Sequence, residues 1–217
     1  MKKVIITGAT GMVGSIVLQH CLQSDEIETV VSVVRRASHI KHRKLREIEH
    51  NDFLNYEVIK NVFKGIDIAY FCIGAYTGAV PDAKFKEITV DYTKAFVNAL
   101  KSESPQARFC FLSGAGADRT EKSRTSFARY KGMAENFMAN SGLEFYSFRP
   151  AYIYPVKKRK EPNLMYTISR SLYPMIKLFG TNASIKSTEL GAAMFKVGLV
   201  GAEKSFLENA AILKVLQ

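Results

Sequence analysis

Along the chain, short runs of β-branched and aromatic residues alternate with longer segments whose apolar residues recur at helical spacing. The first run, at 2–7, ends at glycines, and apolar residues spaced as in a helix follow at 12–24. The same alternation predicts further strands at 29–36, 45–50, 66–74, 107–114 and 144–150 and further helices at 55–65, 84–102 and 124–140. Nearly continuous apolar strands that alternate with amphipathic helices are typical of a parallel sheet covered on both faces. We therefore predict an α/β fold with a doubly wound parallel sheet.

After Pro150 the pattern loosens. The sequence predicts a loop at 151–163, helices at about 163–179 and 188–200, and a last strand at 210–216. We find no internal repeat and no low-complexity tract, and this tail is too short to fold as an independent domain. We therefore expect a single domain over 1–217, to which about 151–217 contribute a small C-terminal substrate lobe.

The composition agrees with one globular domain, since 47% of the 217 residues are hydrophobic and 24% are charged. No apolar run reaches membrane-spanning length, and Cys21, Cys72 and Cys110 are far apart in apolar context, as in reduced cytosolic thiols. The four histidines have no nearby cysteine or carboxylate cluster, so we expect no metal site. These features favour a cytoplasmic protein without a membrane partner.

Positive charge is concentrated in two runs, at 35–46 and 157–160, and the formal net charge is +11. Such runs neutralise phosphates in proteins that bind nucleic acid or an acidic membrane. Aromatic residues do not alternate with these charges as they do on a surface that stacks bases. We therefore expect solvated loops and no nucleic-acid partner.

The first chemical motif is TGATGMVG at 7–14, between the first predicted strand and the first predicted helix. Gly8 permits a tight turn, Gly11 lets a diphosphate approach the backbone, and Gly14 lets the helix pack closely on the strand. Free amides and the positive end of the helix dipole then face the phosphates of a dinucleotide. The other motif residues expected at the cofactor are Thr10, Met12 and Val13. The alternative is a turn that binds nothing, which is less favourable because glycines near a helix start cost stability.

The end of the second predicted strand indicates which dinucleotide binds. Proteins that use NAD place Asp or Glu there, about 20 residues after the glycines, to bind the adenosine ribose. This chain has Arg35 and Arg36 instead. Two guanidinium groups suit the additional 2′-phosphate of NADPH. We therefore predict NADPH as the cofactor, and the alternative is that both arginines begin a solvated basic loop.

With these motifs placed, residues 3–155 resemble the atypical, NAD(P)H-binding branch of the short-chain dehydrogenase/reductase superfamily, which includes the Tat-interacting-protein-type oxidoreductases. The motifs occur in the expected order: TGATGMVG, the RR that ends the second strand, FCIGAYTG, FLSGAGAD, K-G-x-x-E around Lys131, and FRPAYIY. The resemblance implies a Rossmann fold. It also implies cofactor contacts by Asp52 and Phe53 at the adenine, Cys72, Ile73 and Gly74 at the riboses, Lys131 at the nicotinamide ribose, and Pro150 and Ala151 at the nicotinamide.

The resemblance further implies that Ser113 binds a substrate carbonyl and that Lys131 lowers the pKa of a tyrosine four residues before it. Position 127 is a phenylalanine in this chain, so the hydroxyl that would donate a proton is missing. Three explanations are open. Tyr130 donates from a shifted position, a loop tyrosine donates instead, or the protein binds NADPH without efficient catalysis. The loop tyrosines are Tyr76, Tyr152 and Tyr154.

For Tyr130, an ordinary half-buried core position is favoured over a catalytic role, but we retain it with Ser113 and Lys131 in the candidate catalytic set. We predict an NADPH-dependent oxidoreductase that reduces a small carbonyl substrate. The alternative is an NADPH-binding sensor or scaffold with little or no activity, which Phe127 favours. A homodimer is one alternative for its assembly.

Overall fold

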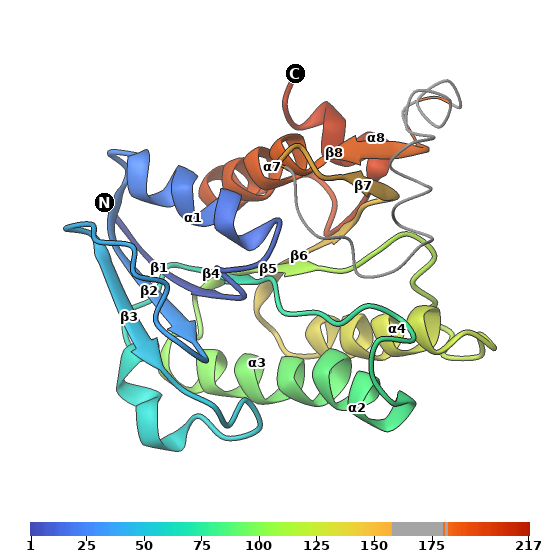
Figure 1. Cartoon of the computed structure of the whole chain (residues 1–217), viewed down its shortest axis with the longest axis horizontal. Coiled ribbons are helices and arrows are strands. Elements are labelled where there is room, and N and C mark those ends of the chain that lie inside the picture. The colour runs from blue at the N-terminus through green and yellow to red at the C-terminus, as the bar shows by residue number, and fades with distance from the viewer. Residues whose placement is uncertain (158–179, 181) are drawn as a thin grey trace.

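The centre of the molecule is a seven-stranded sheet in which every pair of neighbouring strands is parallel (Figure 1). The computed structural model describes residues 1–157, 180 and 182–217. The strand order is β3-β2-β1-β4-β5-β6-β9. The chain adds strands outward from β1 to β3, then crosses over and adds strands in the opposite sense from β4 to β9. The strands are β1 (Lys2–Thr7), β2 (Ile27–Val34), β3 (Leu45–Glu49), β4 (Ile68–Phe71), β5 (Arg108–Leu112), β6 (Glu144–Arg149) and β9 (Phe206–Glu208).

Helices cover both faces of this sheet. Figure 1 shows α1 and α7 on one face and α3 and α4 on the other. The helical segments are α1 (Gly14–Gln23), η1 (Glu57–Phe63), α2 (Asp82–Lys86), η2 (Glu87–Asp91), α3 (Tyr92–Glu103), α4 (Ser126–Ala139), α7 (Ser187–Val200) and α8 (Asn209–Lys214). The prediction of a doubly wound α/β Rossmann fold is confirmed. Among the described residues, no helix is both long and apolar enough to cross a membrane.

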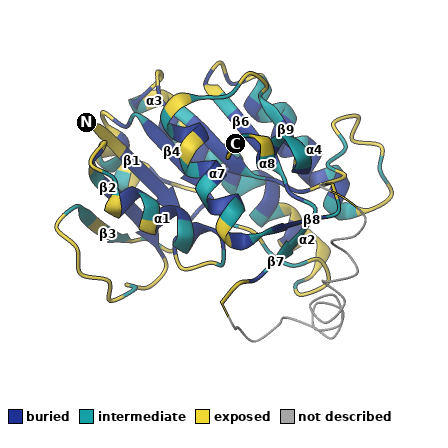
Figure 2. Cartoon of the chain, turned by 90° about the horizontal axis from the view of Figure 1, so that it is seen from above, coloured by how far each residue is buried: buried dark blue, intermediate teal, exposed yellow. Residues whose placement is uncertain are grey.

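The hydrophobic core has two layers, one on each face of the sheet. Val4 and Ile6 of β1 belong to the layer under α1 and α7, whereas Ile5 belongs to the layer under α3 and α4. Successive side chains of a strand point to opposite faces, so a strand covered on both sides is apolar throughout. Figure 2 shows these strands as buried beneath the helices, with exposed residues on loops and outer helix faces.

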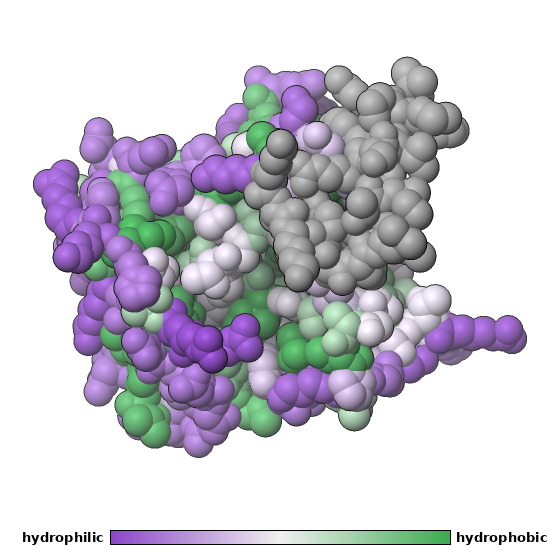
Figure 3. Space-filling model, viewed as in Figure 1, coloured by the Kyte–Doolittle hydropathy of each residue, from purple (hydrophilic) through white to green (hydrophobic). Residues whose placement is uncertain are grey.

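On the outer surface, strongly hydrophilic residues lie mainly at the margins of the face shown in Figure 3. Among the residues drawn in colour, apolar and weakly polar ones, in green and white, occupy much of the middle, beside one strongly hydrophilic group in dark purple.

Two predicted helices differ from the structure in detail. The segment predicted at 55–65 is the 3₁₀ helix η1, in which Ile59 (φ −117°) has a non-helical backbone conformation. The helix predicted at 84–102 begins at Asp82 and passes through the π-helical turn η2 before α3. The helix predicted at about 163–179 lies outside the described residues.

The prediction of a last strand at 210–216 is wrong. This segment falls largely in α8, and the strand that completes the sheet is β9, which comes just before it. A short apolar run is compatible with either a strand or a helix, so periodicity alone does not distinguish them. Two short strands that we did not predict, β7 (Tyr152–Tyr154) and β8 (Ser184–Lys186), form a separate parallel pair.

Candidate functional site

Two adjoining cavities flank the glycine-rich turn. The larger has a volume of about 590 Å³ and the smaller about 370 Å³. Both are lined by Thr10 and Gly11, after β1, and by Cys72, Ile73 and Gly74, after β4. The strand order reverses between β1 and β4, which is where open α/β sheets bind their ligands.

Close backbone contacts in this turn leave no space for a side chain at Gly8 or Gly14. Gly8 has φ +73°, and a Cβ atom there would lie 2.5 Å from the carbonyl oxygen of Cys72. A Cβ atom on Gly14 would lie 2.2 Å from the carbonyl oxygen of Gly8. The Gly11 amide donates to that same oxygen at 2.9 Å and completes the turn. Glycine at positions 8 and 14 is therefore required by close backbone contacts, as the motif predicts.

Helix α1 begins at this turn, and its first residues border the larger cavity. Met12, Val13 and Ser15 line the cavity, and the first turn of α1 contains no acidic residue. The first amides of a helix have no acceptor within the helix and lie at the positive end of its dipole. The start of α1 therefore suits a diphosphate.

The smaller cavity has aromatic and cationic walls. The rings of Phe53 and Tyr92 stack with centroids 5.6 Å apart, and both line the cavity beside Asn51. Two cations also line it, Arg35 after β2 and Lys84 of α2, and none of the described lining residues is acidic. Lys84 is paired with Glu87, so Arg35 is the cation of this cavity for which no ion pair is described, and the combination suits the adenosine half of a dinucleotide.

Two residues predicted for this region lie outside the described lining. Arg36 is exposed, and the Asp52 carboxylate accepts a hydrogen bond at 3.1 Å from the amide two residues later. Asn51 lines the cavity instead, and its place soon after β3 is a signal that could have identified it. Lys84 comes from a separate helix, so no motif indicated it.

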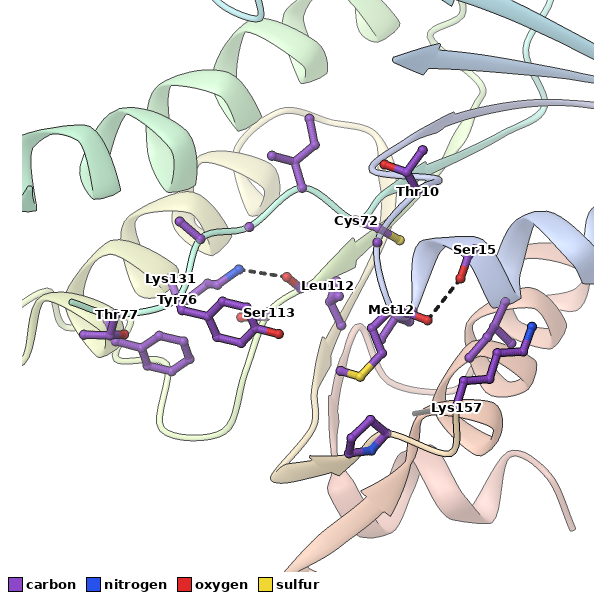
Figure 4. A pocket seen from close by; sticks show the side chains of 18 residues that line it. Thr10, Met12, Ser15, Cys72, Tyr76, Thr77, Leu112, Ser113, Lys131 and Lys157 are labelled. Atoms are coloured by element: carbon purple, nitrogen blue, oxygen red, sulfur yellow. Dashed lines mark hydrogen bonds between the residues drawn. The ribbon is translucent and has the colours of Figure 1, made fainter. Parts of the chain in front are cut away.

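The larger cavity brings together the residues expected at the reacting centre. Ser113, directly after β5, and Lys131 of α4 line this cavity together with Phe127 and Tyr76. Figure 4 shows Lys131, Ser113 and Tyr76 on one side of the cavity and Met12 on the other. Two predicted site residues thus share a cavity with one of the loop tyrosines.

Lys131 is held in a buried position. It is 6% exposed, and its Nζ donates to the Leu112 carbonyl oxygen at 2.8 Å (Figure 4). The Nζ atom also lies 4.6 Å from the centre of the Phe111 ring. Burial lowers the pKa of Lys131 to about 8, although the nearby Glu135 carboxylate favours the charged form. The Lys131 ammonium group therefore lies at the cavity wall and loses a proton more readily than an exposed lysine does.

Phe127 fills the position where a proton-donating tyrosine is expected. Its ring packs against Gly114, where an added Cβ atom would lie 2.4 Å from Cζ of Phe127. Cζ is the atom that would carry the hydroxyl in tyrosine. The aromatic ring is thus present at the cavity, and the hydroxyl is absent.

Tyr130 is not brought together with Ser113 and Lys131. It is 6% exposed, and its hydroxyl donates to Oδ2 of Asp82 at 2.6 Å. Its ring packs near Phe85, with centroids 6.0 Å apart, and it lies outside the described lining of both cavities. The structure places Tyr130 in the packing between α2 and α4, as the favoured core interpretation predicts.

The segment after β6 contributes to the larger cavity at other positions than predicted. Pro150 and Ala151 lie outside the described lining, and the Ala151 amide donates to Oδ1 of Asn209 at 2.9 Å. Pro155 and Lys157 line the cavity instead. No spacing in this loosely patterned segment indicated these two residues.

Cys72 lines both cavities as a protonated thiol, because burial raises its pKa to about 12. The described part of the chain contains no group of three or more His, Cys, Asp or Glu residues arranged to hold a metal ion.

The residues present fit a nicotinamide dinucleotide. The glycine-rich turn, whose backbone is bare at Gly8, Gly11 and Gly14, lies between two cavities, and cations line both. The start of α1 supplies amides for the diphosphate between them.

Comparisons with known proteins agree with this geometry. The chain is similar to the Bordetella bronchiseptica enzyme WbmH, solved with NAD+, at 18% identity and a TM-score of 0.71 over 95% of this chain and 74% of that one. It is similar to a Rossmann-fold NAD(P)-binding family protein from Shigella flexneri at 20% identity and a TM-score of 0.63, covering 94% of this chain and 89% of that one. A short chain dehydrogenase/reductase from Saccharomyces cerevisiae matches at 14% identity and a TM-score of 0.68, covering 95% of both chains.

At such identities these likenesses show the fold alone. The model of the NAD(P)H-binding family matches residues 8–171, which include the glycine-rich turn and the larger part of the chain. The chain therefore belongs to the NAD(P)H-binding family.

Proposed function

We propose that this protein is an NADPH-dependent oxidoreductase that reduces a small carbonyl compound, with Tyr76 as proton donor in place of the missing tyrosine. The observation that carries this proposal is the cavity shared by Ser113, Lys131 and Tyr76 beside the glycine-rich turn. The match to the NAD(P)H-binding family supports it, and so does the smaller cavity, which offers a separate place for the adenosine.

The proposed cofactor contacts follow from the two cavities. The amides of Met12 and Val13 bind the diphosphate, and Arg35 binds the 2′-phosphate. The Phe53–Tyr92 pair and Asn51 surround the adenine, since aromatic faces and an amide suit a flat base with polar edges. Lys131 and the segment 72–74 contact the ribose groups.

When bound, the nicotinamide supplies the hydride that forms the new C–H bond at the carbonyl carbon. Tyr76 donates its phenolic proton to the carbonyl oxygen, so the product is an alcohol. The Lys131 ammonium stabilises the resulting phenolate, which takes a proton back from solvent. Leu112, Met12 and Phe127 form the apolar part of the wall and limit the access of water to this centre.

Tyr76 is preferred over the other tyrosines because of where each side chain lies. The Tyr130 hydroxyl is directed to Asp82, away from Ser113. Tyr152 and Tyr154 belong to β7 and lie outside the described lining of the larger cavity. Figure 4 shows the Tyr76 ring inside that cavity.

The test is oxidation of NADPH against a panel of aldehydes and ketones by the wild type, Tyr76→Phe and Tyr130→Phe. General-acid assistance is typically worth about 10²- to 10⁴-fold, so we expect kcat to fall by about that factor in Tyr76→Phe. Tyr130→Phe is the matched control, since it also removes one phenol, and its kcat should stay close to that of the wild type. Loss of turnover in Tyr130→Phe with full activity in Tyr76→Phe would overturn the assignment.

Phe127 favours a second candidate function, an NADPH-binding sensor or scaffold. Tight NADPH binding without turnover in the wild type, and without gain in Phe127→Tyr, would support this second function. Calorimetry that shows no binding of NADPH or NADH would contradict both.

A further inference from the structure

The hydroxyl of Ser113 has one hydrogen, and the structure shows where it points. Ser113 lies at the end of β5, lines the larger cavity and is 7% exposed. Its Oγ donates to Oε1 of Glu135, one helical turn after Lys131, at 2.8 Å. A serine hydroxyl donates one hydrogen bond and accepts up to two. With its hydrogen directed at Glu135, Ser113 presents only lone pairs to the cavity.

The surroundings of the Glu135 carboxylate make it a strong acceptor for the Ser113 hydrogen. Its side chain is fully buried, and Oε1 also accepts from Oγ of Ser147 at 2.7 Å and Nε of Arg149 at 3.0 Å. The second carboxylate oxygen pairs with Nη2 of Arg149, and Nη1 of the same guanidinium pairs with Glu208 at 2.8 Å. An ionised carboxylate only accepts hydrogen bonds, and bonds to it are roughly twice as strong as neutral ones. A neutral carbonyl oxygen in the cavity is therefore the weaker competitor for the Ser113 hydrogen.

We propose that Glu135 fixes Ser113 as a hydrogen-bond acceptor, and that the site consequently selects carbonyl compounds that carry a neighbouring hydroxyl group. The substrate hydroxyl donates to Ser113, and the carbonyl oxygen faces Tyr76. The substrates are then hydroxyketones or hydroxyaldehydes. This inference rests on the proposed function, and it replaces the carbonyl contact that the family resemblance implies for Ser113.

The rest of the wall agrees with a substrate rich in hydroxyl groups. Thr10, Ser15 and Thr77 line the larger cavity in addition to Ser113 and Tyr76. The hydroxyls of Thr10 and Thr77 can donate and accept, whereas Oγ of Ser15 donates to the Met12 carbonyl oxygen at 3.3 Å and offers lone pairs to a ligand. A site built to bond a substrate hydroxyl discriminates strongly against an analogue that lacks it, because its buried polar group is left unpaired.

The test uses two matched pairs of probes, hydroxyacetone against acetone and acetoin against butanone. Binding to the protein saturated with NADPH is measured by saturation-transfer NMR, and kcat/KM by NADPH oxidation. We expect the wild type to favour the hydroxylated member of each pair by at least about tenfold in affinity. The binding measurement matters because a hydroxyl group also changes the reactivity of the carbonyl.

Three variants identify the residues responsible. Ser113→Ala should abolish the preference, and Glu135→Gln should reduce it, because the neutral amide oxygen that faces Ser113, Ser147 and Arg149 holds the serine hydrogen more weakly than a carboxylate does. Ser147→Ala is the matched control, since it removes one donor from the same oxygen of Glu135 without touching the cavity. It should keep the preference. If Glu135→Gln does not fold, the contrast between Ser113→Ala and Ser147→Ala still shows whether Ser113 is responsible for the preference.

The outcomes separate this inference from the proposed function. Equal affinity for both members of each pair, a preference that survives Ser113→Ala, or no binding of either probe to the NADPH complex would overturn the inference alone. Absence of NADPH binding would overturn the proposed function instead.

Discussion

At the scale of single residues, Arg35 is the side chain expected to decide between the two dinucleotides. It lines the smaller cavity, whereas the adjacent Arg36 lies outside the described lining. Hydrogen bonds to charged groups contribute about 1.5–3 kcal/mol, so we expect Arg35→Ala to weaken NADPH binding by about 10- to 100-fold and to leave NADH binding within about threefold. Isothermal titration calorimetry with both cofactors measures this.

Arg36→Ala is the control for Arg35→Ala, because it removes the same charge one position away. Its effect on NADPH binding should be several times smaller. An equal loss of affinity for NADPH and NADH in Arg35→Ala would show that the guanidinium acts on a group common to both cofactors.

Lys131 makes the stability of the free protein depend on pH. Burial lowers its pKa to about 8, whereas an unfolded lysine titrates near 10.4. Between these values the unfolded chain binds more protons than the folded one, so the contribution of Lys131 to the free energy of unfolding rises with pH. Below about pH 8 the cost of burying the charge is fully present. We expect the difference in stability between the wild type and Lys131→Met to move in favour of the wild type from about pH 8 to about pH 10.

Urea unfolding of both proteins across this range measures the difference. The buried Cys21 and Cys110 have raised pKa values and act in the opposite direction above their ordinary pKa, but they are present in both proteins and cancel. Cys72 interacts with Lys131, so its contribution changes with the substitution. Parallel pH profiles for the two proteins would contradict a lowered pKa for Lys131.

Site residues were predictable where a strand end fixes the chemistry. Gly8 and Ser113 follow β1 and β5 directly; the glycine motif indicated the first, and the family resemblance implied the second. Residues from other elements were not predictable, because Lys84 and Pro155 reach the cavities through tertiary packing and belong to no motif. The bond from Ser113 to Glu135 is of the same kind, since it needs the placement of α4 against β5.

At the scale of elements, the regions predicted well are those with one dominant pattern. Strands β4 and β5 lie in the middle of the sheet and are nearly all apolar, and the neighbouring β1 has the buried β-branched run 4–6, so their type was clear. The C-terminal error has a local cause. The run at 210–216 is apolar enough for a strand, and the real strand β9 has only three residues, paired with β6 on one side. Elements this short are specified by their neighbours more than by their own sequence.

The packing of α7 on α1 depends on a glycine. A Cβ atom on Gly191 would lie 2.4 Å from Cγ2 of Ile16. Alanine gains about 1 kcal/mol in helix propensity over glycine, but overpacking costs about 1–3 kcal/mol. We expect Gly191→Ala to lower the free energy of unfolding by up to about 2 kcal/mol in urea titrations. In an Ile16→Ala background the same change should be less destabilising, because the clashing Cγ2 methyl group is gone and only Cβ of residue 16, at 2.8 Å, remains close.

Equal destabilisation in both backgrounds would show that contact with Ile16 is not the cause. The double-mutant cycle isolates this pair from the other effects of each substitution.

At the scale of the whole molecule, the charge and the cavities act together on the approach of the cofactor. The chain carries a formal net charge of +11, and four cations, Arg35, Lys84, Lys131 and Lys157, line the two cavities without an acidic residue among the described lining. Clefts lined by one sign of charge focus the field and raise association rates by about 10- to 10³-fold. NADPH carries one more phosphate than NADH, so it should be steered more strongly.

We therefore expect the association rate constant of NADPH to fall by about tenfold between about 20 mM and about 500 mM KCl, and that of NADH to fall less. The dissociation rate constants should change less than the association rate constants, because close contacts in the cavities are screened less than long-range attraction. Stopped-flow measurements of nicotinamide fluorescence give both constants.

Arg35→Ala should reduce the salt dependence for NADPH, whereas Lys64→Gln, at an exposed lysine outside the described lining of both cavities, should leave it nearly unchanged. If the association rate constants of both cofactors do not vary with salt, the excess positive charge does not steer the dinucleotide to the cavities.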